Sequence, residues 1–350
     1  MIPKRSLWRT IAKHPAFAPF LVLIVLMIVA SLTSPHFLQV RNILNITRQV
    51  SYTGIIALGM TFIIIAGGID LSVGSAVAFI GGVIILAMNY CFAELAPGSQ
   101  LHAFFFALAC GLGIGFVGGI VSGTLVTKFS VAPFIATLGT MGIYRSLALY
   151  VGDGGEFRVS SGIKAFRDFG TGGVGTIGGP GGVPYPSIIF ILLAVVFGVI
   201  LGWTRFGRYV CAVGSNEKVA AYAAVKVDRV RIWTYIISGL TVGLSAFLLG
   251  GRMNSINSTN AGMLYELDSI AAVVIGGTAM TGGSGSMMGT VIGALILGVI
   301  NNLLNMWGVS AYLQGTVKGL VIVLAVLMQR PEVQAPVRRA LRAVFPGKGR

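Results

Sequence analysis

The chain has 350 residues, of which 55% are hydrophobic and only 10% are charged, and its formal net charge is +15. A soluble domain carries about 25% charged residues to wet its surface, so this composition excludes an ordinary soluble protein. Glycine supplies 50 residues, and glycine in apolar segments lets helix backbones approach closely where no hydrophobic effect drives association. The composition therefore predicts an all-α bundle of packed transmembrane helices.

The hydropathy pattern predicts about ten spans, because crossing the hydrocarbon core takes roughly 17 to 25 apolar residues. The candidate spans, in chain order, are residues 17–33, 52–67, 71–88, 102–127, 131–150, 187–203, 232–251, 267–282, 287–305 and 312–328. Basic residues precede the first span, but no A-x-A cleavage site follows it, so we expect a retained helix rather than a signal peptide. An even number of spans puts both termini on the cytoplasmic side, with residues 1–330 as one transmembrane domain and residues 331–350 as a basic tail.

The charges of the predicted loops support this orientation in the cell (inner) membrane, because Lys and Arg gather on the cytoplasmic side of membrane proteins. The predicted inner loops and termini hold most basic residues: Lys4, Arg5, Arg9, Lys13, Lys128, Arg205, Arg208, Lys218, Lys226, Arg229, Arg231, Arg330, Arg338, Arg339, Arg342, Lys348 and Arg350. The predicted outer loops hold Arg41, Arg48, Arg158, Lys164, Arg167 and Arg252 beside the acids Glu94, Asp153, Glu156, Asp168, Glu266 and Asp268. Membrane orientation thus explains the positive charge, which excludes nucleic acid as a partner and leaves membrane lipid.

The longest predicted loop, residues 151–186, lies on the outer side and is too rich in Gly and Pro for regular structure. We expect it to form a flexible external cap. Its Gly173, Gly175 and Gly178 spell GxGxxG, but no strand precedes and no helix follows this pattern. We therefore reject a dinucleotide site.

The string AGGIDLSVG at residues 66–74 interrupts the apolar pattern between the second and third spans. Gly67 and Gly68 permit a helix break. A carboxylate at membrane depth costs about 2.5–3.5 kcal/mol, so Asp70 must be paired, hydrated or capping a helix. Asp70 or Ser72 can accept hydrogen bonds from the exposed N–H groups of the next helix. This capping role and direct contact with a transported substrate are the two interpretations.

A related string, GGTAMTGGSG at residues 276–285, lies in the second half of the chain, and paired breaks in two halves of a transporter are expected near a central path. Its last four residues also match the GxSG motif of intramembrane serine proteases, which need a histidine base on a neighbouring helix. His14, His36 and His102 lie outside the spans or at a predicted helix end. We therefore reject the protease.

The predicted inner loop, residues 204–231, contains a short helix signal outside the membrane. Its Gly-Ser-Asn-Glu string predicts a turn and an N-cap, with the acid favourably placed in the first helical turn. A short amphipathic helix there is suited to docking into a groove on another protein, whereas a solvated loop with ordinary positive-inside charge is the alternative. The candidate docking residues are Gly214, Asn216, Glu217, Lys218 and Tyr222.

Amides mark the last part of the chain. Asn301 and Asn305 share a helix face at i and i+4, and amides suit sugar hydroxyls because they both donate and accept hydrogen bonds. Two interpretations follow: these amides line a transport path, or they join neighbouring helices by hydrogen bonds. Arg145 and Lys318 lie close to the predicted outer boundary, where snorkelling to the interface explains them.

Apart from the rejected GxSG string, the sequence contains no motif for covalent chemistry. Cys91, Cys110 and Cys211 have no metal-ligand spacing, so we predict no metal site and no catalytic residue. The phosphate-binding pattern GxxxxGK[ST] is missing from the sequence, so the chain is not itself a P-loop ATPase. Any coupling to ATP must come from a partner chain.

Four stretches together resemble the permease subunits of the ribose, xylose, arabinose and galactose class of ABC importers. They are GIIALGMTFIIIAGGIDLSVGS (54–75), VAPFIATLGTMGIYRSLALYVGDG (131–154), TRFGRYVCAVGSNEKVAAYAAVKVDRVRIWTYIISGL (204–240) and ELDSIAAVVIGGTAMTGGSGSMMGTVIGALILGVINNLL (266–304). The GGIDLSVG and GSNE strings are the specific parts. This resemblance implies a transport subunit for a small sugar and not an enzyme.

The resemblance also implies partners: a second permease copy, cytoplasmic ABC ATPase subunits that use the ATP, and an external (periplasmic) sugar-binding protein. The family's ATPase contact carries over to Gly214, Asn216, Glu217 and the helix after them. The family usually has glycine near the end of that helix, where this chain has Ala223-Ala224-Val225. Alanine there predicts a longer helix and a stiffer turn.

The leading alternative is an ion-coupled secondary transporter, which also uses broken helices and polar residues at the midplane. In the sequence, only Asp70 lies where a buried carboxylate would serve ion coupling. A channel or purely structural protein is a third class. The inner loop discriminates, because only an ATP-driven importer needs Glu217.

Overall fold

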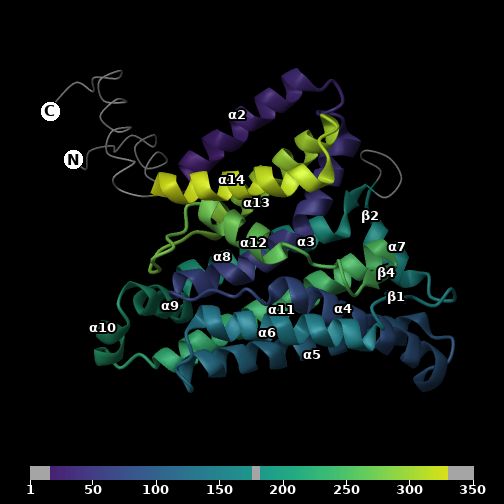
Figure 1. The fold of residues 1–350 in the computed structure, drawn as a ribbon, viewed down its shortest axis with the longest axis horizontal. Helices are drawn as coiled ribbons and strands as arrows, with labels where there is room; N and C mark the ends of the chain where they lie inside the picture. The colour runs from purple at the N-terminus through teal and green to yellow at the C-terminus, as the bar shows by residue number, and fades with distance from the viewer. Residues whose placement is uncertain (1–15, 176–181, 330–350) are drawn as a thin grey trace, which may run out of the picture.

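The computed structural model describes residues 16–175 and 182–329, which form a bundle of helices (Figure 1). The long helices are α2 (Phe17–Thr33), α3 (Val40–Ile65), α4 (Val73–Tyr90), α5 (Gln100–Thr127), α6 (Pro133–Val151), α8 (Tyr185–Trp203), α11 (Val227–Met253), α13 (Met287–Met306) and α14 (Ala311–Gln329). The shorter helices are η1 (Cys91–Leu95), α7 (Ala165–Thr171), α9 (Arg205–Ser215), α10 (Glu217–Tyr222) and α12 (Tyr265–Ile275). The strands are β1 (Glu156–Arg158), β2 (Gly173–Val174), β3 (Val183–Pro184) and β4 (Ser255–Asn257).

Seven helices of the described part are long and apolar enough to cross a membrane, which confirms a polytopic helical protein. Residues 17–33 and 313–324 are apolar but shorter. The prediction of a continuous span at residues 267–282 is wrong, because α12 ends at Ile275 after 11 residues. A helix of that length rises about 16 Å, roughly half the thickness of the hydrocarbon core.

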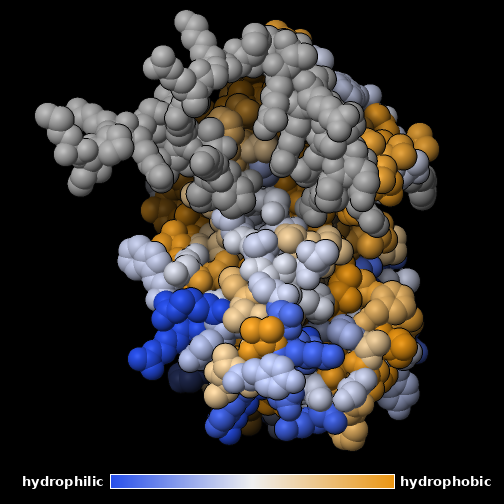
Figure 2. Space-filling view, turned by 90° about the vertical axis from the view of Figure 1, so that its left-hand side faces the viewer, coloured by the Kyte–Doolittle hydropathy of each residue, from blue (hydrophilic) through white to orange (hydrophobic). Residues whose placement is uncertain are grey.

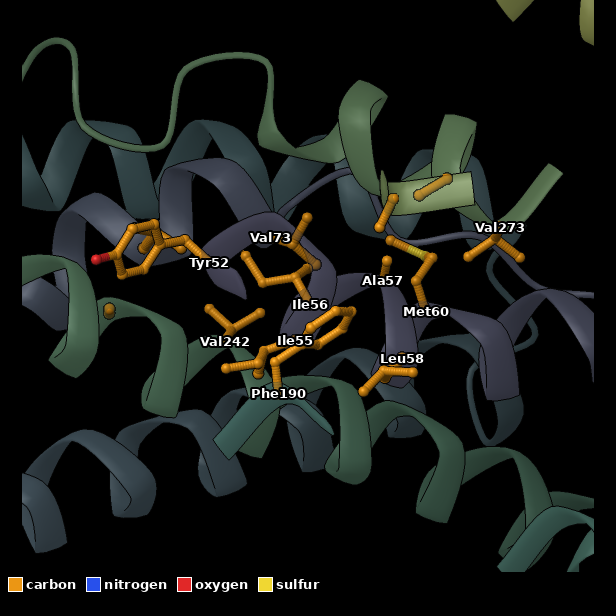
Figure 3. Packing of buried hydrophobic residues seen from close by; sticks show 14 of the residues in the cluster. Tyr52, Ile55, Ile56, Ala57, Leu58, Met60, Val73, Phe190, Val242 and Val273 are labelled. Atoms are coloured by element: carbon orange, nitrogen blue, oxygen red, sulfur yellow. The ribbon is translucent and has the colours of Figure 1, made fainter. Parts of the chain in front are cut away.

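Helix α3 lies at the centre of the core, and its side chains pack against several neighbouring helices (Figure 3). Every residue from Ile55 to Ile65 is buried. The ring of Phe190 in α8 fills the space beside Gly54, where a Cβ atom would lie 2.7 Å from a ring carbon. Helix α3 is therefore enclosed by neighbouring helices on several sides.

Helices α5 and α11 pack backbone to backbone along a row of glycines. A Cβ atom on Gly115 would overlap the carbonyl group of Gly239, and one on Gly243 would meet the carbonyl oxygen of Gly111. Such close approach lets dispersion contacts and backbone dipoles hold two helices together without a hydrophobic driving force. This pairing accounts for part of the unusual glycine content.

The outer loop is folded, so the prediction of a flexible cap is wrong for its described part. Strand β1 pairs with β4 in an antiparallel register that joins Phe157 to Ile256. The side chain of Phe166 in α7 is fully buried, with its ring centre 5.0 Å from that of Phe247. Aromatic contacts of this kind anchor α7 to the helix bundle. The cap and the α9–α10 pair lie at opposite ends of the long axis (Figure 1).

Several predicted features lie outside the described residues. They are the basic residues Lys4, Arg5, Arg9 and Lys13, the tail at residues 331–350 with Arg330 before it, and Gly178 of the GxGxxG string.

Candidate functional site

The first predicted break is a glycine-capped helix end. Gly67 has a φ of 80°, a left-handed conformation that favours glycine. The N–H of Gly67 donates to the carbonyl oxygen of Ile64 at 3.0 Å, and the N–H of Gly68 donates to that of Ile63 at 2.9 Å. These two bonds define a Schellman cap, which satisfies carbonyl groups at the helix end. Gly67 and Gly68 therefore stop α3 as predicted.

The second break repeats this geometry. Gly277 has a φ of 89° and donates to the carbonyl oxygen of Val274, while Thr278 donates to that of Val273. The extended segment that follows then returns to the first break, because the N–H of Gly283 donates to the carbonyl oxygen of Ile65 at 2.8 Å. The two breaks therefore lie in direct contact.

Asp70 lies between the first break and α4 and is buried. Its Oδ1 accepts hydrogen bonds from the N–H of Ser72 at 2.9 Å and from the Ser72 hydroxyl at 2.6 Å. The carboxylate therefore satisfies two hydrogen-bond donors of Ser72, the residue before α4. Because the Ser72 hydroxyl donates to Asp70, it does not cap α4. The residue borders a cavity of about 20 Å³ together with Tyr144 and Tyr235, enough for one water molecule.

The predicted N-cap in the inner loop is confirmed. The side-chain oxygen of Asn216 accepts from the N–H of Val219 at 3.1 Å and begins α10. Glu217 then forms a two-pronged ion pair with Arg231 of α11, at 2.9 and 2.8 Å. Val219 and Tyr222 are 60% and 90% exposed. Helix α10 therefore presents apolar and aromatic side chains that no other described residue covers.

Hydrophilic side chains gather on the lower part of this end of the molecule, beside hydrophobic ones (Figure 2). The exposed basic side chains on α9, α10 and the start of α11 are Arg205, Arg208, Lys218, Lys226 and Arg229. The surface around the exposed Tyr222 is thus positively charged, as expected of the cytoplasmic side of a membrane protein.

Gly214 connects this surface to both breaks. A Cβ atom on Gly214 would overlap the carbonyl group of Ile65 and lie 2.6 Å from the backbone nitrogen of Gly283. The next residue, Ser215, lies against Gly283: a Cβ atom on Gly283 would be 2.9 Å from the Cα atom of Ser215. Only glycine allows this approach without a shift of the backbone. Gly214 is therefore the point where α9, the end of α3 and the second break meet.

The prediction that Ala223-Ala224-Val225 lengthens α10 is wrong, because the helix ends at Tyr222. Ala224 has a φ of 60° and donates to the carbonyl oxygen of Ala221, and Val225 donates to that of Ala220. This is the same Schellman cap as at Gly67 and Gly277, with alanine in the position that favours glycine. The turn overrides the helix propensity of alanine at a cost of about 1–2 kcal/mol.

A chamber of about 500 Å³ with both polar and apolar residues in its wall opens between α3, α12, α13 and the β1–β4 cap. Its polar and charged lining residues are Gln49, Tyr52, Thr53, Glu156, Arg252, Ser255, Asn257, Asn260, Tyr265, Asp268, Asn301 and Lys318. Hydrogen bonds from the Ser255 hydroxyl and from Arg158 hold the pKa of Glu156, in the cap, below its usual range. The chamber therefore has an ionised carboxylate at its rim and amide and hydroxyl groups in its wall.

The two candidate amides separate in the structure. Asn301 lines the chamber, and its Oδ1 is buried without a hydrogen-bond partner among the described residues. Asn305 is exposed, does not line the chamber, and accepts a hydrogen bond from Gln314 at 2.9 Å. The shared helix face therefore does not bring both amides to one site.

The membrane-depth cations have partners, so snorkelling does not explain them. Lys318 donates to Asp268 Oδ2 at 2.9 Å, and both side chains are mostly buried. Arg145 donates to the backbone carbonyl groups of Ser258, Thr259 and Ala261 at 2.9 to 3.2 Å. Sequence reasoning placed Asp268 in an outer loop and named Asp70 as the one candidate carboxylate, whereas the structure buries both.

Comparison with known proteins identifies relatives along most of the chain. Residues 42–326 match the family model described as a branched-chain amino acid transport system permease component. The chain is 43% identical to the ribose import permease protein RbsC of Bacillus subtilis over 89% of its length and 92% of that protein. It is 40% identical to the Escherichia coli K12 RbsC over 88% of its length and 91% of that protein.

A third relative carries a different sugar in its name. The L-arabinose ABC transporter permease protein AraH of Azospirillum brasilense is 32% identical over 96% of this chain and 92% of its own length. No solved structure matches the chain significantly.

Proposed function

The chain belongs to the family of transport-system permease components that its residues 42–326 match, and we propose that it is the membrane-spanning subunit of an ATP-driven importer for a small sugar. It is a multi-pass protein of the cell membrane. The family description names amino acids, but the relatives with 40–43% identity are ribose import permeases and a further one is an arabinose permease. Both sugars are pentoses, so a pentose is the substrate class we propose.

The chain works with partners in this proposal. Two permease copies form the path, two cytoplasmic ABC ATPase subunits bind and hydrolyse ATP, and an external sugar-binding protein delivers the sugar. The permease holds no cofactor. Residues 1–330 act as one domain of ten crossings with both termini cytoplasmic, and α12 together with the extended segment after it supplies one of these crossings.

The contact of Gly214 with both breaks is the observation that carries the mechanism. Closure of the ATPase subunits on ATP moves α10, which docks through Val219, Tyr222 and Glu217. Because Gly214 packs on Ile65 and Gly283 without intervening side chains, displacement of α9 shifts the ends of α3 and the second break together. The path then opens to the outer side and closes to the inner side, which is a shift between two conformations driven by a partner.

The test is co-purification from the native host in mild detergent, followed by reconstitution into liposomes that contain ATP. Uptake of radiolabelled ribose is then measured with the external sugar-binding protein added outside. A P-loop ATPase in roughly equal amount, together with ATP-dependent uptake, supports the proposal. A chain that purifies alone and moves ribose along an ion gradient without ATP contradicts it. In that case Asp70 and Asp268 become the residues to examine for ion coupling.

A further inference from the structure

The chamber has the size of a small-molecule site. Its volume of about 500 Å³ falls within the roughly 300–1,000 Å³ of typical ligand pockets. Its walls come from α3, the end of α11, α12, α13 and α14, and the β1–β4 cap forms its outer rim. The chamber therefore lies between the cap and the level of the helix breaks, on the route that a solute from outside would take.

The charges in the wall balance. The charged lining residues are two acids, Glu156 and Asp268, and two bases, Arg252 and Lys318. Lys318 neutralises Asp268 directly at 2.9 Å, with side-chain exposures of only 20% and 12%, and the Arg252 guanidinium lies 5.7 Å from the centre of the Tyr52 ring. A ligand with net charge would bring an uncompensated charge into this partly dry site, which is costly.

Two groups in the wall have unused hydrogen-bonding capacity. Lys318 bonds one oxygen of Asp268, and its other oxygen, Oδ1, has no hydrogen bond within the described part of the chain. The Asn301 amide lines the chamber while its Oδ1 is buried and unpaired. A buried acceptor without a partner is destabilising, so rotation of this amide toward an entering hydroxyl group removes an existing penalty.

We propose that the chamber binds neutral polyhydroxylated molecules. Asp268 accepts hydrogen bonds from ligand hydroxyl groups, and the Asn301 amide both accepts hydrogen bonds from them and donates to them. Lys318 is a positioning residue: it fixes the carboxylate and cancels its charge, so that the site discriminates against charged sugars such as sugar phosphates. This inference rests on the proposed function and adds to it the binding residues and the charge class of the ligand.

The experiment measures occupancy of the chamber by protection from thiol labelling. The complex carries the permease with Cys91, Cys110 and Cys211 replaced by alanine and with Thr53→Cys, in liposomes exposed to a membrane-impermeant maleimide. Thr53 lines the chamber and is not one of the proposed binding groups. Asn45→Cys is the matched control, because Asn45 lies on the same helix, is exposed, and does not line the chamber. The probes are ribose, ribitol and ribose 5-phosphate.

We expect ribose and ribitol to slow labelling at position 53 severalfold, ribose 5-phosphate to have no effect at equal concentration, and position 45 to react equally throughout. Adding Asp268→Asn should raise the ribose concentration for half-protection about tenfold, as expected for loss of a hydrogen bond to a charged group. Asp268→Asn alone leaves Lys318 without its partner, so the double variant Asp268→Asn with Lys318→Met removes both charges. This double variant should still assemble with the ATPase and should show the same loss of protection.

Equal protection by ribose 5-phosphate, or ribose protection unchanged by Asp268→Asn, would overturn the inference. So would ATP-dependent ribose uptake by the complex with no protection by any probe at saturating concentration. Failure of the proposed function has a different signature: the complex shows no ATP-dependent uptake, and the protection pattern among the three probes is read independently of transport.

Discussion

The backbone N–H of Gly283 donates a hydrogen bond to the carbonyl oxygen of Ile65 at 2.8 Å, and this bond joins the two helix breaks of the molecule. Ile65 is the last residue of α3, so its carbonyl group has no partner inside the helix. The bond therefore satisfies a buried helix end with a donor from the other half of the chain. Gly214 covers this bond from the side of the inner loop.

Replacement of Gly214 should uncouple the inner loop from the breaks. In Gly214→Val the added side chain must displace the Ile65–Gly283 contact, because even a Cβ atom has no space there. We expect the ATPase to remain bound through α10 while ATP-dependent uptake falls at least tenfold. Co-purification and uptake are measured on the same preparation.

Gly202→Val is the matched control for this change. Gly202 lies in α8, is exposed, and has no heavy atom within 4 Å of the position of an added Cβ. This variant should transport normally. Normal uptake by Gly214→Val would show that the close packing at Gly214 plays no part in coupling.

A charge exchange separates the docking role of Glu217 from its ion pair with Arg231. This pair is half exposed, and exposed pairs contribute about 0–1 kcal/mol. If the carboxylate meets the ATPase, Glu217→Lys should abolish ATPase co-purification and uptake. The double variant Glu217→Arg with Arg231→Glu should fail equally, although it restores the ion pair.

Arg231→Gln is the control, because it breaks the pair and leaves Glu217 in place. It should retain ATPase binding and most uptake. Rescue by the double variant would instead show that the intramolecular pair, and not contact with the ATPase, is what the loop requires.

The glycine row between α5 and α11 predicts a large difference between two neighbouring positions. Gly115→Ala should destabilise the protein by about 1–3 kcal/mol, because the added methyl group overlaps the Gly239 carbonyl and overpacks a closed interface. Gly113→Ala, on the same helix, points into open space and should be neutral or gain up to about 1 kcal/mol of helix propensity. Thermal unfolding in detergent measures both, and similar midpoints for the two variants would contradict the backbone contact.

The sequence predicted most helix positions within a few residues because apolar length is a local property. It was wrong at the start of α3, which begins at Val40 and not at residue 52, so Arg41 and Arg48 lie in this helix and not in an outer loop. It failed at α12, where the run from Ile270 to Ile275 continues into Gly276 and Gly277 without a charge to end it. The Gly-rich string at residues 276–285 was nonetheless predicted to be a break paired with the one at residues 66–74, and the structure shows a helix end at Gly277.

The chamber was out of reach of sequence reasoning for a different reason. Tyr52, Arg252 and Lys318 lie in separate helices more than sixty residues apart along the chain, so only tertiary packing brings them together. The ion pair between Glu217 and Arg231 could not be predicted either. The turn at Ala224 brings the two residues together, and the sequence did not predict that turn.

That turn provides the last prediction. Ala224 adopts a left-handed conformation with a φ of 60°, which costs a residue with a Cβ atom about 1–2 kcal/mol. Ala224→Gly removes this strain. Glycine also raises the conformational entropy of the unfolded chain, which offsets the gain by about 0.4–1 kcal/mol. The net effect should be stabilisation of the α10 turn by roughly 0.5–1 kcal/mol, seen as slower amide hydrogen exchange over residues 217–226. Ala221→Gly in the same helix is the control and should accelerate exchange, because glycine within a helix is destabilising. If Ala224→Gly also accelerates exchange, the turn is not held in the left-handed conformation, and the predicted extension of the helix by alanine would be correct after all.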